Sequence, residues 1–546
     1  MASESPGARS VGPVAPGGAR TIAEMVDARA ESSGDVPLLE CEGEIVTYAQ
    51  MSERSARLAG SLRGLGLAAG DRVAMLSANS TSVIEMYLAC ARLGIIVVPL
   101  NIFLRGDFLR FQIEDSGAVA ALVDPPGLSA VRDLGPGLAL RHLIVVGQAH
   151  PDLGTIPYQD LIDAAPGRFS SDTALGDTAA IMYTSGTTGM AKGCMLPHGQ
   201  FVHLAQPFLD AGHYRTGDRV ISPSPMFHVG FLGAMFAPVV ACGATVLSLR
   251  EFRASTFMQQ ARDGAATVIF GVGAIGTLLL AQPESPGDAG PGNPRHALLT
   301  PMSSQSQVDF ELRFGVAVNS SSYGQTECTA ITLSTLGDPV DRAASGRPVD
   351  ALDVRIVDDA DRPVPAGKAG EVVIRPKVSD VMFSGYWNAG DATRLAWRNL
   401  WHHTGDIGRW TPSGELVVID RKKDSIRRRG ENVSSMEIEG VVRRHPSVEL
   451  VAAHAVPSDL GEDDIKVCLV LRPGESVTAE ELFEFFKTSL PYFAVPRYVE
   501  ILPEFPTNAV GKVLKHVLRD RGATADTWDF EALGFSITRR DRRSTP

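Results

Sequence analysis

The sequence predicts an α/β protein, because short strand-favouring segments alternate with amphipathic helical segments through most of the chain. Early in the chain, the β-branched segment 72–76 is followed by a helical pattern over 82–93 and a second apolar segment over 95–99. The same order of strand, helix and strand returns over residues 244–272. Such alternation is typical of parallel sheets that are covered by helices on both faces. We therefore expect a large N-terminal domain of helix-covered sheets.

Two further parts are predicted downstream. Over residues 353–374 the pattern changes to strands and turns with prolines between them, which predicts a β subdomain. A capping box formed by Ser434 and Glu437 then begins a helix, and strands follow over 451–471, which predicts a small α+β C-terminal domain. The expected division is a disordered tail over 1–20, an N-terminal domain over 21–422 and a C-terminal domain over 423–546.

The composition is that of a globular protein. The chain of 546 residues is 44% apolar, which is ample for two or three folding units with large cores. Its net charge of −12 provides no general attraction to nucleic acid or to an anionic membrane, so we expect neither as a partner. Two uncharged runs, 231–249 and 264–282, approach membrane-spanning length, but both contain glycines and the first contains Pro238. They are better interpreted as buried strand–helix segments.

The cysteines and the N-terminal residues indicate a reducing compartment. The 6 cysteines are widely spaced and form no CxxC pair, so the sequence predicts neither structural zinc nor a disulfide framework. Residues 1–20 are rich in Ala, Gly, Pro and Ser and lack the apolar core of a secretory signal. We therefore expect a cytoplasmic protein, and a homodimer is one assembly that we consider.

The stretch YTSGTTGMAKG, residues 183–193, concentrates hydroxyls, glycines and one lysine. Glycine lets a backbone approach phosphates closely, hydroxyls donate hydrogen bonds, and Lys192 adds a positive charge. The stretch lacks the order of a Walker loop, and the strand-favouring residues before it predict a hairpin. A polyphosphate-binding hairpin loop is the functional interpretation, and an ordinary solvated loop is the alternative when this stretch is taken alone.

Other groups suited to a nucleotide follow downstream. The segment from Tyr323 to Glu327 offers an aromatic ring, a hydroxyl and a carboxylate within five residues, for a base, a phosphate and a divalent cation. Trp401 precedes Asp406, whose carboxylate can accept hydrogen bonds from two ribose hydroxyls. Each residue also has a purely structural interpretation, with Asp406 in a turn and Glu327 at the start of a helix.

Two basic residues complete the set. Arg421 follows in DRKKDSIRRRGENVSSMEIE, and Lys512 lies in PTNAVGKVLKHVL, where a solvated lysine is the structural alternative. With these motifs in this order, the chain resembles the adenylate-forming superfamily of acyl-CoA synthetases, peptide-synthetase adenylation domains and beetle luciferases. The resemblance covers residues 20–520 and is strongest to the carnitine/crotonobetaine–CoA ligase branch.

The resemblance implies a residue for each task of acid activation, in which a carboxylate and ATP give an acyl-adenylate and pyrophosphate. Lys512 would bridge the carboxylate and the α-phosphate, and Lys423 would be the hinge of a mobile C-terminal domain. His228 would close the acid pocket, although a core histidine is the alternative. The remaining implied roles are the pyrophosphate loop (Thr184, Ser185, Gly186, Thr187, Thr188, Gly189 and Lys192), the α-phosphate (Thr326), Mg²⁺ (Glu327), adenine (Tyr323) and the ribose (Asp406 and Arg421).

Three hypotheses for the activity of the chain stay open. The segment GENVSSMEIE favours an acid–CoA ligase that uses ATP, Mg²⁺, CoA and a small-molecule acid. Arg429 replaces a glycine of many relatives, which keeps open an ATP-dependent diazotase that would activate nitrite and join it to an aryl amine without CoA. A binding protein or degenerate paralogue is the third. The acid pocket is expected to be mostly apolar, with Met226, Phe227, Phe231, Met302 and Gln325 as its suggested lining.

Overall fold

The computed structural model describes residues 18–148, 150–163, 172–184, 191–338, 341–421, 426–428, 431–433, 435–457, 463–490, 494–507, 513–535 and 537. The internal contacts divide the chain into two compact units. The predicted boundary at residue 423 lies outside the described residues. The first unit comprises Met1–Arg355, Ile374–His402 and Thr411–Val417, and the second comprises Ile356–Val373, His403–Trp410 and Val418–Pro546.

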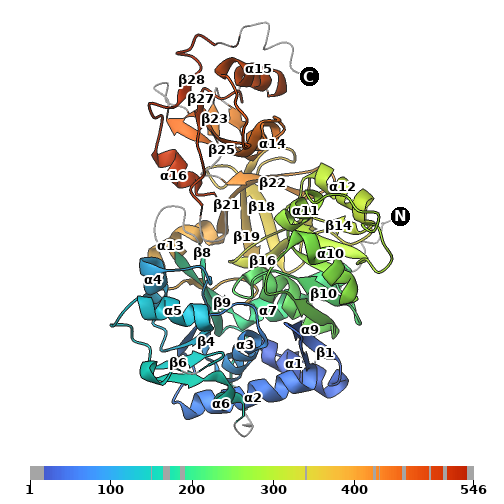
Figure 1. The fold of residues 1–546 in the computed structure, drawn as a ribbon, viewed down its shortest axis with the longest axis vertical. Coiled ribbons are helices and arrows are strands. Elements are labelled where there is room, and N and C mark those ends of the chain that lie inside the picture. Colours follow the sequence, from blue (N-terminus) through green and yellow to red (C-terminus); the bar gives the residue numbers. More distant parts are fainter. Residues whose placement is uncertain are drawn as a thin grey trace, which may run out of the picture. The chain divides into compact units, whose positions relative to one another are not determined.

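An eight-stranded sheet forms one layer of the first unit (Figure 1). Its central strands are parallel, and at one edge β9 pairs antiparallel with β8 and β20 pairs antiparallel with β9. Central strands such as β4 and β5 are buried along their whole length, because a parallel sheet is covered on both faces. In order across the sheet the strands are β20 (Gly385–Tyr386), β9 (Lys192–Pro197), β8 (Thr178–Thr184), β4 (Ile96–Pro99), β3 (Arg72–Leu76), β5 (Ala120–Val123), β6 (His142–Val145) and β7 (Thr155–Pro157).

A seven-stranded sheet forms a second layer of the same unit. It is parallel except for β2, which pairs antiparallel to β1 at the edge. The uncharged run 231–249 contributes β11 and the helices before it, so the buried strand–helix interpretation of that run is confirmed. In order the strands are β14 (Ala317–Asn319), β13 (His296–Thr300), β12 (Val268–Val272), β10 (Arg219–Ser222), β11 (Thr245–Ser248), β1 (Pro37–Cys41) and β2 (Glu44–Thr47).

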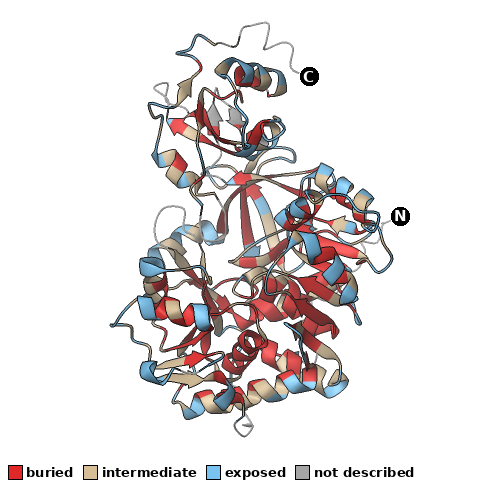
Figure 2. Ribbon diagram, in the orientation of Figure 1, coloured by how far each residue is buried: buried red, intermediate tan, exposed pale blue. Residues whose placement is uncertain are grey.

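Helices cover both sheets, and their burial follows their sequences (Figure 2). The helix α3 is apolar around most of its circumference and is buried along nearly all of its length, where it packs against α2. Of the described helices, none has both the length and the apolar character needed to cross a membrane. The helices of this unit are α1 (Ile22–Ser33), α2 (Tyr48–Gly64), α3 (Thr81–Leu93), α4 (Gly106–Ser116), α5 (Pro125–Asp133), η2 (Pro151–Leu153), α6 (Tyr158–Ile162), α7 (His198–His203), α8 (Ala205–Asp210), η3 (Gly230–Phe236), α9 (Ala237–Cys242), α10 (Ala254–Asp263), α11 (Gly273–Leu280), α12 (Ser304–Phe314), α13 (Gly390–Ala396) and η4 (Arg398–Leu400).

Smaller sheets occupy the second half of the chain. The predicted β subdomain corresponds to a four-stranded sheet, in which β18 and β19 reproduce the two expected strands. A three-stranded sheet, β15-β16-β17, carries the Tyr323–Glu327 motif. The strands are β15 (Ser322–Gln325), β16 (Cys328–Leu333), β17 (Arg347–Pro348), β18 (Leu352–Val357), β19 (Gly370–Pro376), β21 (His402–Trp410) and β22 (Leu416–Arg421).

The C-terminal part is the α+β fold that the sequence predicts. Its core brings together side chains of β25, β26, α14 and α15, among them Ile438, Ile465 and Phe486. The helix expected after Ser434 is present as α14, whereas its predicted capping pair lies outside the described side chains. The elements are β23 (Ile426–Arg428), β24 (Glu431–Val433), α14 (Ser435–Val442), β25 (Val448–Pro457), β26 (Asp463–Leu471), α15 (Ala479–Ser489), β27 (Tyr498–Ile501), α16 (Lys515–Asp520) and β28 (Trp528–Asp529).

Candidate active site

The predicted phosphate-binding stretch is a β-hairpin loop. Strands β8 and β9 run antiparallel, and Thr184 pairs with Lys192 at the point where the loop leaves the ladder. The Thr184 hydroxyl donates to the Lys192 carbonyl at 3.5 Å. The hairpin prediction is therefore confirmed, and it places the two ends of the stretch side by side. The loop residues Ser185, Gly186, Thr187, Thr188 and Gly189 lie outside the described residues.

Side chains from two distant segments hold the base of this hairpin. The Tyr183 hydroxyl donates to Asp115 at 2.6 Å, at the end of α4. The Trp387 indole nitrogen donates to the Asp115 carbonyl at 2.8 Å, and its backbone N–H donates to Gly193 at 2.7 Å. The strands on both sides of the loop are thus tied to α4 and to the segment after β20. None of these contacts follows from the sequence motif.

Thr326 and Glu327 form the two-residue turn between β15 and β16. The turn is held from both sides, because Gln200 Nε2 donates to the Thr326 carbonyl at 3.1 Å and the Phe383 N–H donates to the Glu327 carbonyl at 2.8 Å. Gly324 sits at a register irregularity of β15, where a Cβ would strike the Thr329 carbonyl. Glu327 therefore lies in a hairpin turn, and the helix-start alternative for it is wrong.

Tyr386 brings the phosphate hairpin and the Glu327 turn together. Its hydroxyl donates to Glu327 Oε1 at 2.7 Å, and the Lys192 ammonium lies 5.3 Å from the centroid of its ring. Burial raises the pKa of the Cys194 thiol beside them, and the Glu327 carboxylate raises it further. The site therefore combines a carboxylate, a cation and a neutral thiol. Tyr386 is not among the residues predicted from the sequence, because it belongs to none of the recognised motifs.

The residues suggested for the acid pocket differ in how far the structure buries them. His228 is exposed and lies against Phe227 with ring centroids 4.6 Å apart, so the core-histidine alternative is wrong. Met226 and Phe231 are buried at 1% and 0% exposure. Tyr323 is half-buried in β15, opposite Thr332. The remaining suggested lining comprises Met302, which is buried, and Gln325, which is half-buried.

The two residues expected at the ribose meet in the second unit. Arg421 Nε lies 2.6 Å from Asp406 Oδ1, between the adjacent strands β22 and β21. The Asp406 side chain is 5% exposed and the Arg421 side chain is 49% exposed. The Asp406 N–H donates to the Thr404 hydroxyl, which donates in turn to the Val372 carbonyl at 2.6 Å. The carboxylate is thus fixed while its cationic partner faces solvent.

A polar cluster flanks the predicted hinge and the predicted catalytic lysine. Asp420 accepts from the N–H of Arg421 at 2.7 Å and from the N–H of Ser435 at 2.6 Å, which ties together the two ends of the hinge segment. Lys515 donates to Ser435 Oγ at 2.8 Å and lies 2.7 Å from Glu439 Oε1. Burial raises the pKa of Glu439, and Lys515 opposes that rise. Lys423 and Lys512 themselves lie outside the described residues.

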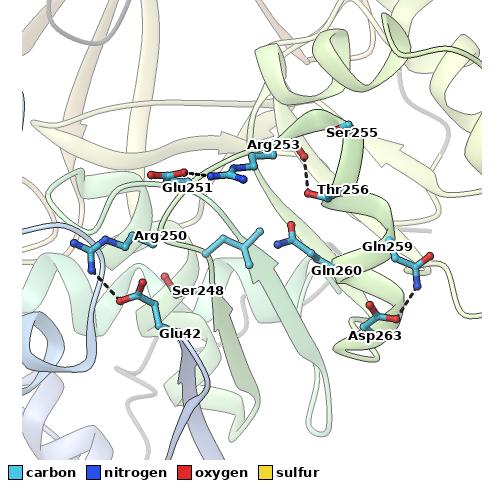
Figure 3. A pocket seen from close by; sticks show the side chains of 11 residues that line it. Glu42, Ser248, Arg250, Glu251, Arg253, Ser255, Thr256, Gln259, Gln260 and Asp263 are labelled. Carbon is cyan, nitrogen blue, oxygen red and sulfur yellow. Dashed lines mark hydrogen bonds and ion pairs between the residues drawn. The ribbon is translucent and has the colours of Figure 1, made fainter.

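A surface hollow of about 1000 Å³ lies elsewhere on the first unit (Figure 3). It is lined by the segment after β11 and by α10, and its charged side chains are already paired. Arg250 contacts Glu42 at 2.9 Å, and Arg253 contacts Glu251 at 3.0 Å. Of the predicted site residues that the structure describes, none lines this hollow.

Comparisons with known proteins agree with the geometry. Residues 26–387 match the AMP-binding enzyme family, and residues 437–512 match the AMP-binding enzyme C-terminal domain. The crotonobetaine/carnitine–CoA ligase of Salmonella paratyphi A is 29% identical over 521 residues, which are 92% of this chain and 99% of that protein. The feruloyl-CoA synthase of an Amycolatopsis species is 31% identical over 510 residues, 90% of this chain and 97% of its own.

Solved structures share the fold. ATP-bound MatB from Rhodopseudomonas palustris superimposes with a TM-score of 0.81 at 25% identity, over 91% of this chain and 98% of its own. The Bacillus subtilis o-succinylbenzoate CoA synthetase, in complex with ATP and a magnesium ion, gives 0.77 at 27% identity over the same shares. An anthranilate CoA ligase in complex with anthranoyl-AMP gives 0.80 at 22% identity, over 92% and 97% of the two chains, and supports the fold alone.

Proposed function

We propose that this chain, which belongs to the AMP-binding enzyme family of adenylate-forming enzymes, activates a small-molecule carboxylic acid with ATP and transfers the acyl group to CoA. The observation that carries the proposal is the meeting of Lys192 and Glu327 around Tyr386. These residues come from separate hairpins, and together they supply the cation and the carboxylate that binding of a metal–polyphosphate requires.

The proposed reaction has two steps. In the first, a carboxylate oxygen attacks the α-phosphorus of ATP, the bond to the β-phosphate oxygen breaks, and pyrophosphate leaves with the electron pair. In the second, the CoA sulfur attacks the acyl carbon, AMP leaves, and the thiol proton passes to solvent. A carboxylate is a poor electrophile because its charge is delocalised, so it becomes reactive only as the mixed anhydride.

Different residues would serve different functions in the first step. The loop from Thr184 to Lys192 would bind the β- and γ-phosphates with N–H, hydroxyl and ammonium donors. Thr326 would donate to the α-phosphate, and Lys512 would place a positive charge where the two anions meet. The carboxylate of Glu327 has the ligand chemistry that Mg²⁺ prefers, and the bound cation would neutralise charge on the leaving pyrophosphate.

The remaining roles concern orientation. Asp406, with Arg421 beside it, would accept from the ribose hydroxyls and so fix the angle of the phosphate chain. Tyr323 would lie against adenine, and His228 would close the acid pocket. We also propose that the C-terminal domain, from residue 423, turns about Lys423 between the two steps, as the resemblance implies.

The relatives favour CoA as the acceptor. The crotonobetaine/carnitine–CoA ligase, the feruloyl-CoA synthase and the o-succinylbenzoate CoA synthetase described above carry CoA-ligase or CoA-synthase names, and none of them supports the diazotase hypothesis. The curated relatives are named for chemically different acyl groups, crotonobetaine or carnitine in one and a feruloyl group in the other. The pair of exposed His228 and half-buried Phe227 is compatible with an acid that carries an apolar or aromatic body.

A panel of acids tests the proposal. Ferulate, anthranilate, crotonobetaine and o-succinylbenzoate are incubated with ATP, Mg²⁺ and enzyme, and AMP, pyrophosphate and thioester are measured. We expect at least one acid to release AMP and pyrophosphate, with thioester formed only when CoA is present. AMP release that requires nitrite and an aryl amine, and is indifferent to CoA, would overturn the proposal.

A further inference from the structure

Tyr386 contacts two predicted ligand-binding residues, one through its hydroxyl and the other through its ring. Its hydroxyl donates to Glu327 Oε1 at 2.7 Å, and the face of its ring lies 5.3 Å from the Lys192 ammonium. Among the residues that the structure describes, Lys192 and Glu327 form no direct ion pair. The tyrosine therefore holds a cation and a carboxylate near each other without joining them.

Backbone pairing and ring packing fix the position of Tyr386. Strand β20 pairs Tyr386 with Cys194 of β9, and the Tyr386 N–H donates to the Thr393 hydroxyl at 2.9 Å. Its ring packs against Phe383 with centroids 5.1 Å apart, and the Phe383 N–H donates to the Glu327 carbonyl. The short segment 383–386 thus holds both the backbone and the side chain of Glu327.

We propose that Tyr386 is a positioning residue for the carboxylate of Glu327 and sets the affinity of this site for a divalent cation bound with ATP. This inference rests on the proposed function. A hydroxyl that donates to Oε1 restricts the rotamer of the Glu327 carboxylate, which the Cys194 thiol also contacts, and so positions it before a cation binds. Residues that orient a metal ligand in this way change metal affinity by about 10- to 100-fold when they are replaced.

The Lys192 contact adds a second effect that can be separated from the first. The ring face attracts the ammonium, and replacement of tyrosine by phenylalanine keeps the ring while it removes the hydroxyl. Tyr386→Phe should therefore weaken cation binding and leave the KM for ATP nearly unchanged at saturating cation. Tyr386→Leu removes the ring as well, and we expect it to raise the KM for ATP in addition.

Direct cation binding is the main measurement. Mn²⁺ is titrated into enzyme with a non-hydrolysable ATP analogue and followed by electron paramagnetic resonance, so that the readout does not depend on turnover. We expect Tyr386→Phe to weaken Mn²⁺ binding by about 10-fold or more. In a Glu327→Gln background the same substitution should have no further effect, because the carboxylate that it orients is gone.

Tyr158→Phe is the matched control. Tyr158 likewise donates its hydroxyl to a glutamate, in this case the buried Glu85, and it is not among the predicted site residues. We expect this variant to lose thermal stability and to keep the Mn²⁺ affinity of the wild type. Equal Mn²⁺ affinity in wild type and Tyr386→Phe, or an equal loss in Tyr158→Phe, would overturn the inference. Failure of the wild type to bind Mn²⁺ with the analogue would instead overturn the proposed function, and the inference with it.

Discussion

Asp406 and Arg421 form an ion pair of 2.6 Å in which the carboxylate is almost fully buried and the guanidinium is half exposed. The two residues lie 15 positions apart in the chain, and the sequence motifs predict both at the ribose of ATP. Adjacent strands bring them together, since β21 and β22 are neighbours in one sheet. The buried carboxylate is rigid, which suits a group that must select one orientation of a sugar.

Asp406→Asn should raise the KM for ATP by about 10-fold, because hydrogen bonds to a charged acceptor are worth about 1.5–3 kcal/mol. Wild-type enzyme should discriminate against 2′-deoxy-ATP, whereas the variant should lose most of this discrimination. Pyrophosphate exchange measures both. Asp353→Asn is the control, since Asp353 contacts Arg355 and Arg375 and has no predicted ligand role. Unchanged discrimination in Asp406→Asn would show that Asp406 does not contact the ribose.

Lys512→Ala should abolish acyl-adenylate formation and leave the melting temperature unchanged. Loss of a donor that stabilises transition-state charge costs about 10²–10³ in rate. Pyrophosphate release and a thermal melt are measured together. Lys487→Ala, at a half-buried lysine on α15 that has no predicted catalytic role, should retain full activity. Near wild-type turnover in Lys512→Ala would refute its assigned role.

Lys423→Pro should separate the two steps, because a hinge must change its backbone angles and proline restricts φ. We expect adenylate formation to survive and thioester formation to fall steeply. Adenylate is measured by isotope exchange, and thioester by product analysis in the same samples. Equal losses in both steps would mean that Lys423 is not the pivot.

Lys515→Met should destabilise the C-terminal unit by about 3 kcal/mol, because it leaves the mostly buried Glu439 carboxylate without its cation. Lys515→Arg should restore most of this loss. The surface pair of half-buried Lys487 and exposed Glu484 provides the control, since Lys487→Met should cost less than about 1 kcal/mol. Denaturant unfolding of the three variants checks the order. A loss in Lys515→Met as small as the control's would contradict the assigned contact.

Stability should fall as the pH is lowered from about 6.5 to 4, in part because of His198. Burial lowers the pKa of His198 to about 4, so the unfolded chain takes up a proton in this window and the folded chain does not. The contribution is about 2 kcal/mol between pH 7 and pH 5. His198→Gln should reduce the pH dependence of urea unfolding by this amount. His150→Gln, at an exposed position, should leave it unchanged.

Much of the architecture could be predicted from local pattern. The apolar runs gave the parallel strands β3, β4 and β12, and the glycine-rich stretch after Tyr183 predicted a hairpin that the structure confirms. These features depend on neighbours in the chain, because side-chain periodicity and backbone freedom are local properties. The residue types at Lys192, Glu327 and Asp406 were likewise sufficient to indicate anionic and ribose ligands.

Only the tertiary structure decided which residues hold those groups in place. Tyr386 contacts Glu327 and Lys192 across 59 and 194 positions of sequence, and Gln200 supports Thr326 across 126. The local sequence around this tyrosine and this glutamine does not predict these contacts, because strand order and register determine which side chains meet. The chain by itself determined the chemical groups of the site, and the packing of β9, β16 and β20 determined their geometry, because distances between remote residues are set by the fold as a whole.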